Sequence, residues 1–275
     1  MTDTPLSNAP VLGPWGRVAA ICRRHYYLYR GSFPRIVELG YWPLMQIFLW
    51  GFITQFLQQH STLIAQASGL LLAGVLLWDV MFRGQLGVSV SFLEELWARN
   101  LGQMFVSPLK PSELAAGLMA VSFARTVIGL APAALATWLL YAFAITDIGP
   151  GLVAFFFLLL AFSWAIGLAV CAMLLRFGLG AESLAWVTVF ALAPISAVYY
   201  PVSILPSWLQ GVALALPSAH VFEGMRAVML ENRFDWGHFF WAAGLDAVAL
   251  AAALWLFVTA FDSARGAGRL LQSGE

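Results

Sequence analysis

Residues 151–175 read GLVAFFFLLLAFSWAIGLAVCAMLL, and they decide the fold class because the stretch contains no charged side chain. A helix needs about 20 apolar residues to cross the hydrocarbon core of a bilayer. This run is longer than that, so it predicts a transmembrane helix.

The composition of the whole chain agrees with this prediction. Hydrophobic residues make up 61% of the chain and charged residues 10%, against about 45–50% and about 25% in soluble domains. So few charges cannot keep that much apolar surface dispersed in water, and lipid must be the solvent for most of the chain. We expect an all-α integral membrane protein with six transmembrane helices, at about 36–57, 63–82, 114–144, 151–175, 184–203 and 236–260. The third stretch is too long for a perpendicular crossing, so we expect it to tilt or to begin in the cytosolic interface.

The distribution of basic residues predicts the orientation, because short loops rich in Lys and Arg stay in the cytoplasm. One side of the expected bundle carries Arg17, Arg23, Arg24, Arg30, Arg35, Arg83, Arg99, Lys110, Arg176, Arg265 and Arg269. The other side carries only Arg226 and Arg233. Both termini are therefore expected in the cytoplasm.

Two cytoplasmic segments have the pattern of amphipathic helices. Between Trp15 and Arg30, apolar and aromatic residues recur at helical spacing with arginines mostly elsewhere on the wheel, which predicts an interfacial helix. Between Leu93 and Met104, an apolar stripe is backed by Glu94, Glu95 and Arg99, the last two four residues apart. We expect a short separate helix here, at about 90–105.

The outer segment between the fifth and sixth spans has a different pattern. A proline-rich turn at 201–206 leads into two apolar segments of roughly 10–14 residues, separated by Pro217. Segments this short do not span a bilayer, and they are typical of re-entrant or interfacial structure. We expect two short re-entrant helices within about 204–231, forming the outer mouth of the protein.

Several chemical classes have no support in the sequence. The single lysine, Lys110, lacks the Gly-Lys-Ser/Thr context of a phosphate-binding loop, and neither a His-Glu-x-x-His zinc motif nor a Gly-x-Ser-x-Gly nucleophile elbow occurs. The formal net charge is zero, so nucleic acid is not an expected partner. The two cysteines give no disulfide framework. We therefore expect no cofactor bound by this chain.

Charged residues inside or near the spans are candidates for function, although each also has a purely structural interpretation. Asp246 is the deepest acid and lies either on a transport path, in a subunit contact, or in a buried pair with Arg125. Two other pairs, Asp79 with Arg83 and Arg35 with Glu38, favour structural roles.

A polar stripe in the outer segment is a second candidate. The stripe residues are His220, Glu223 and Arg226, which repeat every three residues beside Phe222. They form either a gate or the wet face of an interfacial helix. Tyr199 and Tyr200 precede the outer turn and are candidates to line an exit.

The order of these features resembles the permease subunit of type-2 ATP-binding-cassette (ABC) exporters, which include polysaccharide, lipo-oligosaccharide and drug exporters. The resemblance covers nearly the whole chain. The stretches that carry it are 105–113 (FVSPLKPSE), 199–209 (YYPVSILPSWL), and 216–220 (LPSAH) continuing through Glu223 and Arg226.

The resemblance implies a homodimer, or a pair of related permeases, with the substrate path at the interface and two separate ATPase subunits that bind ATP and Mg. It also implies that the segment around 90–105 is a coupling helix, whose contact residues are Leu93, Glu94, Glu95, Leu96, Trp97 and Arg99. The path or outer gate is assigned to Tyr199, Tyr200, His220, Phe222, Glu223, Arg226 and Asp246. Membrane lipid is the remaining partner, the bacterial cytoplasmic membrane is the expected location, and the cargo is a lipid-linked or oligomeric saccharide or a hydrophobic drug.

Three regions follow from these expectations: a cytoplasmic tail with the interfacial helix at 1–35, a six-span domain at 36–260, and a cytoplasmic tail at 261–275. Two other functions stay open at this point. One is an integral-membrane transferase or lipid-modifying enzyme that uses Asp246 or His220. The other is a secondary transporter, which would normally show paired interrupted helices, whereas one interrupted region is found.

Overall fold

The computed structural model describes residues 13–60, 62–141, 149 and 151–268, and in this part of the chain it contains helices and no strands. Five helices are long and apolar enough to cross a membrane. They are α2 (Phe33–His60), α3 (Thr62–Trp97), α5 (Pro111–Tyr141), α6 (Gly151–Phe177) and α10 (Trp236–Gly266). An all-helical membrane protein is therefore confirmed.

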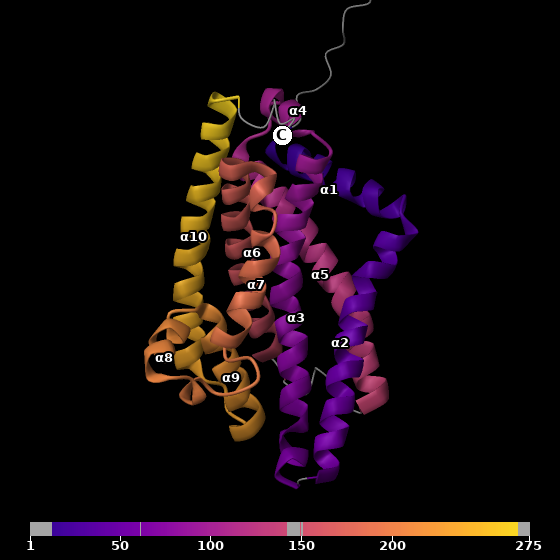
Figure 1. The fold of residues 1–275 in the computed structure, drawn as a ribbon, viewed down its shortest axis with the longest axis vertical. Coiled ribbons are helices and arrows are strands. Elements are labelled where there is room, and N and C mark those ends of the chain that lie inside the picture. The colour runs from indigo at the N-terminus through magenta and orange to yellow at the C-terminus, as the bar shows by residue number, and fades with distance from the viewer. Residues whose placement is uncertain (1–12, 61, 142–148, 150, 269–275) are drawn as a thin grey trace, which may run out of the picture.

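The shorter helices lie at the two ends of this bundle (Figure 1). At one end, where α10 finishes, lie α1 (Pro14–Arg30) and α4 (Leu101–Val106), with α1 packed against α5 and α2. At the other end, α8 (Ser207–Leu214) and α9 (Pro217–Glu231) lie beside the start of α10. We call these the α4 end and the α8 end. Parts of the predicted tails, 1–12 and 269–275, and residues 142–144 of the predicted third span lie outside the described residues.

Helix α3 forms the centre of the bundle. It packs against α6, α5 and α2, while α10 packs mainly against α6. In the most apolar window of α3 83% of the residues are buried, against 17% for α2 and 22% for α10. Close approach in the centre depends on small residues, since a Cβ at Gly84 would collide with Ser163 of α6. The poorly buried helices α2 and α10 therefore present apolar faces to lipid or to other subunits.

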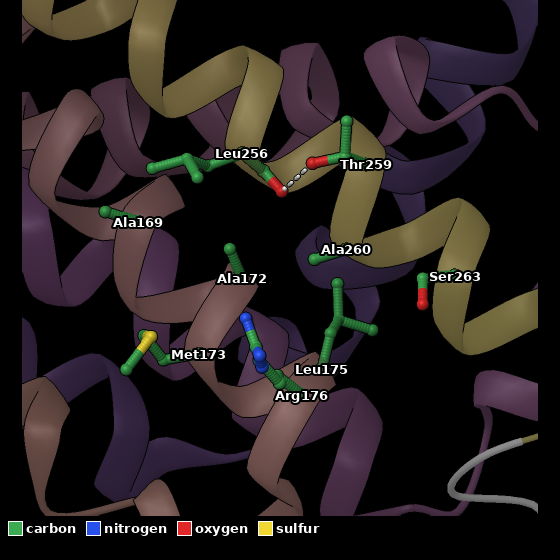
Figure 2. A pocket seen from close by; sticks show the side chains of 9 residues that line it. All are labelled: Ala169, Ala172, Met173, Leu175, Arg176, Leu256, Thr259, Ala260 and Ser263. Carbon is green, nitrogen blue, oxygen red and sulfur yellow. Dashed lines mark hydrogen bonds between the residues drawn. The ribbon is translucent and has the colours of Figure 1, made fainter.

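Helices α6 and α10 also leave a groove between them at the α4 end (Figure 2). Its volume is about 430 Å³.

The expected second span differs from the structure, because α3 continues past residue 82 to Trp97. The prediction of one separate helix over about 90–105 is therefore wrong: residues 90–97 end α3, and α4 begins only at Leu101. Charge does not stop α3 at Arg83, because Arg83 Nε donates to Asp79 Oδ2 at 2.6 Å within the same helix, which confirms that predicted pair. The break comes at Arg99, whose φ is 53°.

The expected fifth span, 184–203, also differs. Helix α7 covers only Leu184–Ile195, about 18 Å at 1.5 Å per residue, and that is too short for a hydrocarbon core of about 30 Å. Pro194 lies in its last turn and Ala197 takes a φ of 52°, so the chain leaves helical geometry here. A short 3-10 helix, η3 (Val202–Ile204), leads on to α8 and α9.

Candidate functional site

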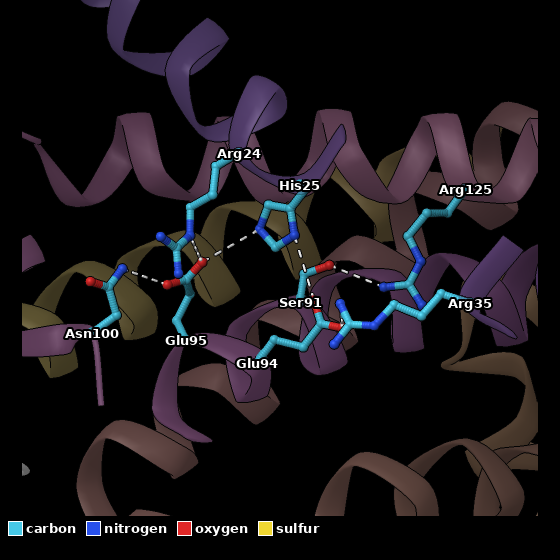
Figure 3. A network of polar contacts seen from close by, with 8 residues as sticks. All are labelled: Arg24, His25, Arg35, Ser91, Glu94, Glu95, Asn100 and Arg125. Carbon is cyan, nitrogen blue, oxygen red and sulfur yellow. Dashed lines mark hydrogen bonds and ion pairs between the residues drawn. The ribbon is translucent and has the colours of Figure 1, made fainter. Parts of the chain in front are cut away.

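A network of charged and polar residues around the buried Glu95 and His25 lies where α1, α2, α3 and α5 meet at the α4 end (Figure 3). We call it the α1–α3 polar cluster, and its members are Arg24, His25, Arg35, Ser91, Glu94, Glu95, Asn100 and Arg125.

The two acids at the end of α3 are the centre of this cluster. Glu95 is almost completely buried and accepts hydrogen bonds from Arg24 Nε and Asn100 Nδ2, both at 2.6 Å. A nitrogen of Arg35 lies 3.2 Å from Glu94. His25 lies between the acids, with its ring nitrogens 3.6 Å from Glu94 and 3.8 Å from Glu95. These distances exceed hydrogen-bond length, so His25 adds charge complementarity only when protonated.

Arg125 of α5 completes the cluster. Its guanidinium donates to Ser91 Oγ at 3.1 Å and lies over the ring of Tyr29, 5.2 Å from the centroid. Two local pairs expected from the sequence are replaced by these longer-range contacts. Arg35 pairs with Glu94 instead of Glu38, and Arg24 and Asn100 take the place of Arg99 at Glu95. The cluster joins four helices and has the character of a structural link.

The residues predicted to contact an ATPase fall into two groups. Leu93 and Leu96 are buried in the core, where Phe92 of the same helix meets Phe257 of α10. Trp97 and Arg99 are exposed, and Trp97 donates its indole N–H to Glu182 at 3.3 Å. Only the exposed pair is placed to touch another protein directly, and contact with an ATPase stays a prediction.

The segment 107–113 is attached to α1. Glu113, in the first turn of α5, accepts from Arg17 Nε at 2.7 Å and from the backbone N–H of Lys110 at 3.0 Å. Pro111 begins α5 and has no N–H to donate. The Glu113 carboxylate therefore accepts the N–H of the preceding residue, Lys110, which has no partner within the helix. This segment therefore fixes the amphipathic helix α1 to α5.

A second polar site lies at the α8 end, where α9 holds the irregular chain that follows α7. We call it the α9 clamp, and it consists of Glu223, Arg226 and the backbone of Ala197, Val198 and Val202. Arg226 is buried and donates to the carbonyl of Ala197 at 2.8 Å and to Glu223 Oε1 at 3.1 Å. Glu223 Oε1 also accepts the backbone N–H of Val202 at 2.7 Å.

The clamp satisfies backbone groups that have no helical partner, a condition that irregular chain in an apolar environment must meet. A further buried hydrogen bond joins Ser196 Oγ and Ser218 Oγ at 2.8 Å. Burial alone would raise the pKa of Glu223, but the hydrogen bonds from Arg226 and from the Val202 amide hold that pKa below its usual value. Glu223 is therefore ionised at neutral pH and pairs with the arginine.

His220 lies one turn from the clamp and is fully engaged. Its Nδ1 is 2.9 Å from Nδ1 of His238, and its Nε2 is 2.9 Å from the carbonyl of Leu214. A carbonyl only accepts, so the Nε2 of His220 carries the proton and His238 donates through Nδ1. Burial lowers the pKa of His220, which favours this neutral form.

The remaining candidates of the outer site are mostly packed against neighbouring side chains. The ring of Tyr199 stacks on Trp50 of α2 at 4.5 Å, and the Tyr200 hydroxyl donates to the carbonyl of Pro194 at 2.7 Å. Phe222 is fully buried in the core and does not border an open path in the described part of the chain. Whether these residues form a gate stays a prediction.

Asp246 is 4% exposed, and neither carboxylate oxygen has a hydrogen-bond partner among the described residues. The expected pair with Arg125 is wrong, because Arg125 belongs to the α1–α3 polar cluster. Asp246 is thus a buried acid of the predicted path that has no polar partner among the described residues.

Sequence reasoning missed the contribution of Arg24, His25 and His238. The first two reach partners about 70 residues away, as in the Arg24–Glu95 pair separated by 71 positions, and no local pattern marks such a contact. His238 does carry a local signal: Asp235 caps α10 by accepting the His238 amide at 3.1 Å.

Comparison with protein families gives one match. A family model described as ABC-2 type transporter matches residues 21–230, which is more than half of the chain and extends from α1 through nearly all of α9. The comparison with curated proteins found no match.

Proposed function

This chain belongs to the ABC-2 type transporter family, and we propose that it is the permease subunit of an ATP-driven exporter. The observation that carries the proposal is the family match, because the matched range contains both polar sites as well as α2 to α7. Membership identifies a multi-pass membrane component of an ABC transporter. The direction of transport, the assembly and the cargo belong to the proposal.

The family implies an ABC ATPase as partner. In our proposal two copies of it bind ATP and Mg, and this chain binds neither. The α4 end is the docking surface, because apolar side chains are exposed there beside basic ones. Trp97 is 50% exposed and Val106 85% exposed, while Arg99 lies two residues after Trp97. Exposed apolar residues rimmed by charge favour a protein contact.

The membrane topology that we propose has six crossings, with α7 and the irregular segment after it completing the fifth. Two features support it. The clamp satisfies the irregular backbone of that segment, and α1 and the last turn of α10 lie at the same end of the bundle (Figure 1). An even number of crossings, with the basic α4 end in the cytoplasm of a bacterial inner membrane, agrees with both.

In the assembled exporter two copies of the chain form the path between them. Support comes from α2, which is mostly unburied and carries exposed Trp42, Phe52 and Phe56 along its length. The cargo in this proposal is a lipid-linked or oligomeric saccharide, or a hydrophobic drug, taken from the resemblance to the exporter class alone.

No specific observation favours the alternative of a transferase or lipid-modifying enzyme. Both ring nitrogens of His220 are engaged, and Asp246 is buried away from any described cavity. Within the described residues there is also no group of three or more His, Cys, Asp or Glu suited to a metal ion.

The proposal is tested by reconstituting the chain with an ABC ATPase in proteoliposomes and measuring ATP hydrolysis and cargo export. Trp97→Ala should reduce export per ATP hydrolysed, because the exposed indole is removed from the docking surface. Trp255→Ala is the matched control, since Trp255 is also exposed, at 66% against 50% for Trp97, but lies on the body of α10. Export by the chain without an ATPase, or equal effects of both substitutions, would contradict the proposal.

A further inference from the structure

The groove between α6 and α10 is built from small side chains and opens at the α4 end (Figure 2). Ala169 and Ala172 of α6 face Ala260 and Ser263 of α10 across it, and Leu256 lies at its deeper part. Because none of the alanines or the serine is long enough to reach the opposite helix, about 430 Å³ is left open. That volume lies in the range of about 300–1,000 Å³ typical of pockets for small ligands.

The groove follows the axis of the helices into the membrane. Arg176 is the penultimate residue of α6 and marks the mouth, and Ala169 lies seven positions deeper. Seven residues correspond to about 10 Å at 1.5 Å per residue, and this places the groove within one leaflet of a hydrocarbon core about 30 Å thick.

The mouth of the groove carries the positive charge of Arg176. Arg176 is exposed and lies over the ring of Phe177 at 5.7 Å, and no salt bridge from it to a described carboxylate is found. The Ser263 hydroxyl makes no hydrogen bond with the described residues, in contrast to Thr259, whose hydroxyl bonds to the carbonyls of its own helix. An arginine with a nearby free hydroxyl is complementary to a phosphate group.

From this geometry we infer that the groove binds one acyl chain of an anionic phospholipid of the cytoplasmic leaflet, with the lipid phosphate at Arg176 and Ser263. A lipid matches both features of the groove, because its acyl chain supplies apolar surface to the alanines and its phosphate supplies an anion to Arg176. An apolar helix of a second copy would match only the first of them. The charged residues of α10 closest in sequence to Ser263 are Asp262 and Arg265; both are exposed and neither lines the groove.

The inference is tested on the purified full chain alone, so its outcome is independent of the proposed export activity. Native mass spectrometry would compare retention of phosphatidylglycerol and phosphatidylcholine with identical acyl chains. Arg176→Gln should lower the preference for phosphatidylglycerol about tenfold, the loss expected for one charge-assisted hydrogen bond. Arg265→Gln removes the same charge outside the groove and should leave the preference unchanged.

A second pair of variants tests the acyl-chain part. Ala260→Leu fills the trough and should abolish tight binding of both lipids, whereas Ala251→Leu, on an exposed face of α10 that does not line the groove, should not. Thermal unfolding of each variant verifies that it is folded. Three results would each overturn the inference. They are an equal loss of phosphatidylglycerol preference in Arg176→Gln and Arg265→Gln, unchanged lipid retention in Ala260→Leu, and a mass spectrum in which Ala260→Leu loses a dimer and keeps its bound lipid.

Discussion

Replacing Arg226 with Gln should free the irregular chain between α7 and α8. The guanidinium makes three kinds of contact that glutamine cannot reproduce together: to the carbonyl of Ala197 at 2.8 Å, to that of Val198 at 3.5 Å, and to both oxygens of Glu223 at 3.1 and 3.3 Å. Removing one partner of a buried ion pair destabilises the fold by about 3–5 kcal/mol, because the other charge stays buried without compensation. Because the Glu223 side chain is 20% exposed, we take the lower end, about 3 kcal/mol.

The assay is hydrogen exchange of the backbone amides of residues 202–205. The Val202 amide donates to Glu223, so its exchange reports directly on the clamp. A loss of about 3 kcal/mol corresponds to roughly a hundredfold faster exchange if opening is local. Arg233→Gln is the control, since Arg233 lies just beyond α9 in an exposed cluster with Glu231 and Asp235. An unchanged rate at Val202 in Arg226→Gln, or the same acceleration in the control, would refute the reasoning.

Three other predictions address the remaining candidates. Leu96→Ala should destabilise the purified chain by about 2–5 kcal/mol in denaturant unfolding because it empties a core position. Trp97→Ala should cost clearly less, because it removes a half-exposed side chain and one exposed hydrogen bond, and an equal loss in both variants would contradict the prediction. The pKa of His220 is lowered in the folded chain from 6.5, so its contribution to stability is complete above about pH 6.5 and is lost as pH falls through the folded value; a thermal midpoint that drops between pH 7.5 and 5.5 in the parent but less in His220→Gln is expected, and identical pH profiles would contradict it. Asp246→Val should raise the thermal midpoint, because it removes a buried carboxyl group that has no hydrogen-bond partner among the described residues; a lower midpoint would mean that this carboxyl has a partner outside the described residues.

The helical membrane fold could be predicted because the apolar composition indicates that lipid surrounds most of the chain, and lipid restricts the backbone to few structures. An uncharged run such as 151–175 has one stable arrangement in lipid, in which the helix satisfies every backbone group. Helix ends were harder to predict, because hydropathy treats each charge as isolated. Arg83 ends the apolar window of the expected second span, yet its pair with Asp79 lets α3 continue to Trp97.

For the polar sites, the sequence predicts which residues share a helix face but not which partners they bind. The stripe of His220, Glu223 and Arg226 could be found from spacing alone, since all three lie on one helix. Their partners could not, because two are backbone carbonyls of a segment expected to be helical and one is a histidine on α10. Similarly, Arg35 has Glu38 within its own helix but pairs with Glu94, because only the folded bundle brings that acid closer.

Helix α3 connects the two polar sites without an intervening loop. It carries Glu95 of the α1–α3 polar cluster near one end, and with 36 residues it extends about 54 Å toward the other. At Gly74 the absent side chain lets the helix approach Val198, since a Cβ built there would lie 3.2 Å from the Val198 carbonyl oxygen. That carbonyl is also the one that Arg226 reaches at 3.5 Å. The same group is thus in contact with the central helix and with the clamp.

A double-variant cycle of Gly74→Ala and Arg226→Gln tests whether α3 and the clamp are energetically coupled or only lie close together. Gly74→Ala adds a methyl group that presses on the Val198 carbonyl and should weaken the clamp without altering either charged residue. If α3 acts on the clamp through this carbonyl, Gly74→Ala should accelerate exchange at Val202 in the parent but add little in Arg226→Gln, where the clamp is already open. Independent, additive effects on the exchange rate would mean that α3 and the clamp touch the same group without acting on one another.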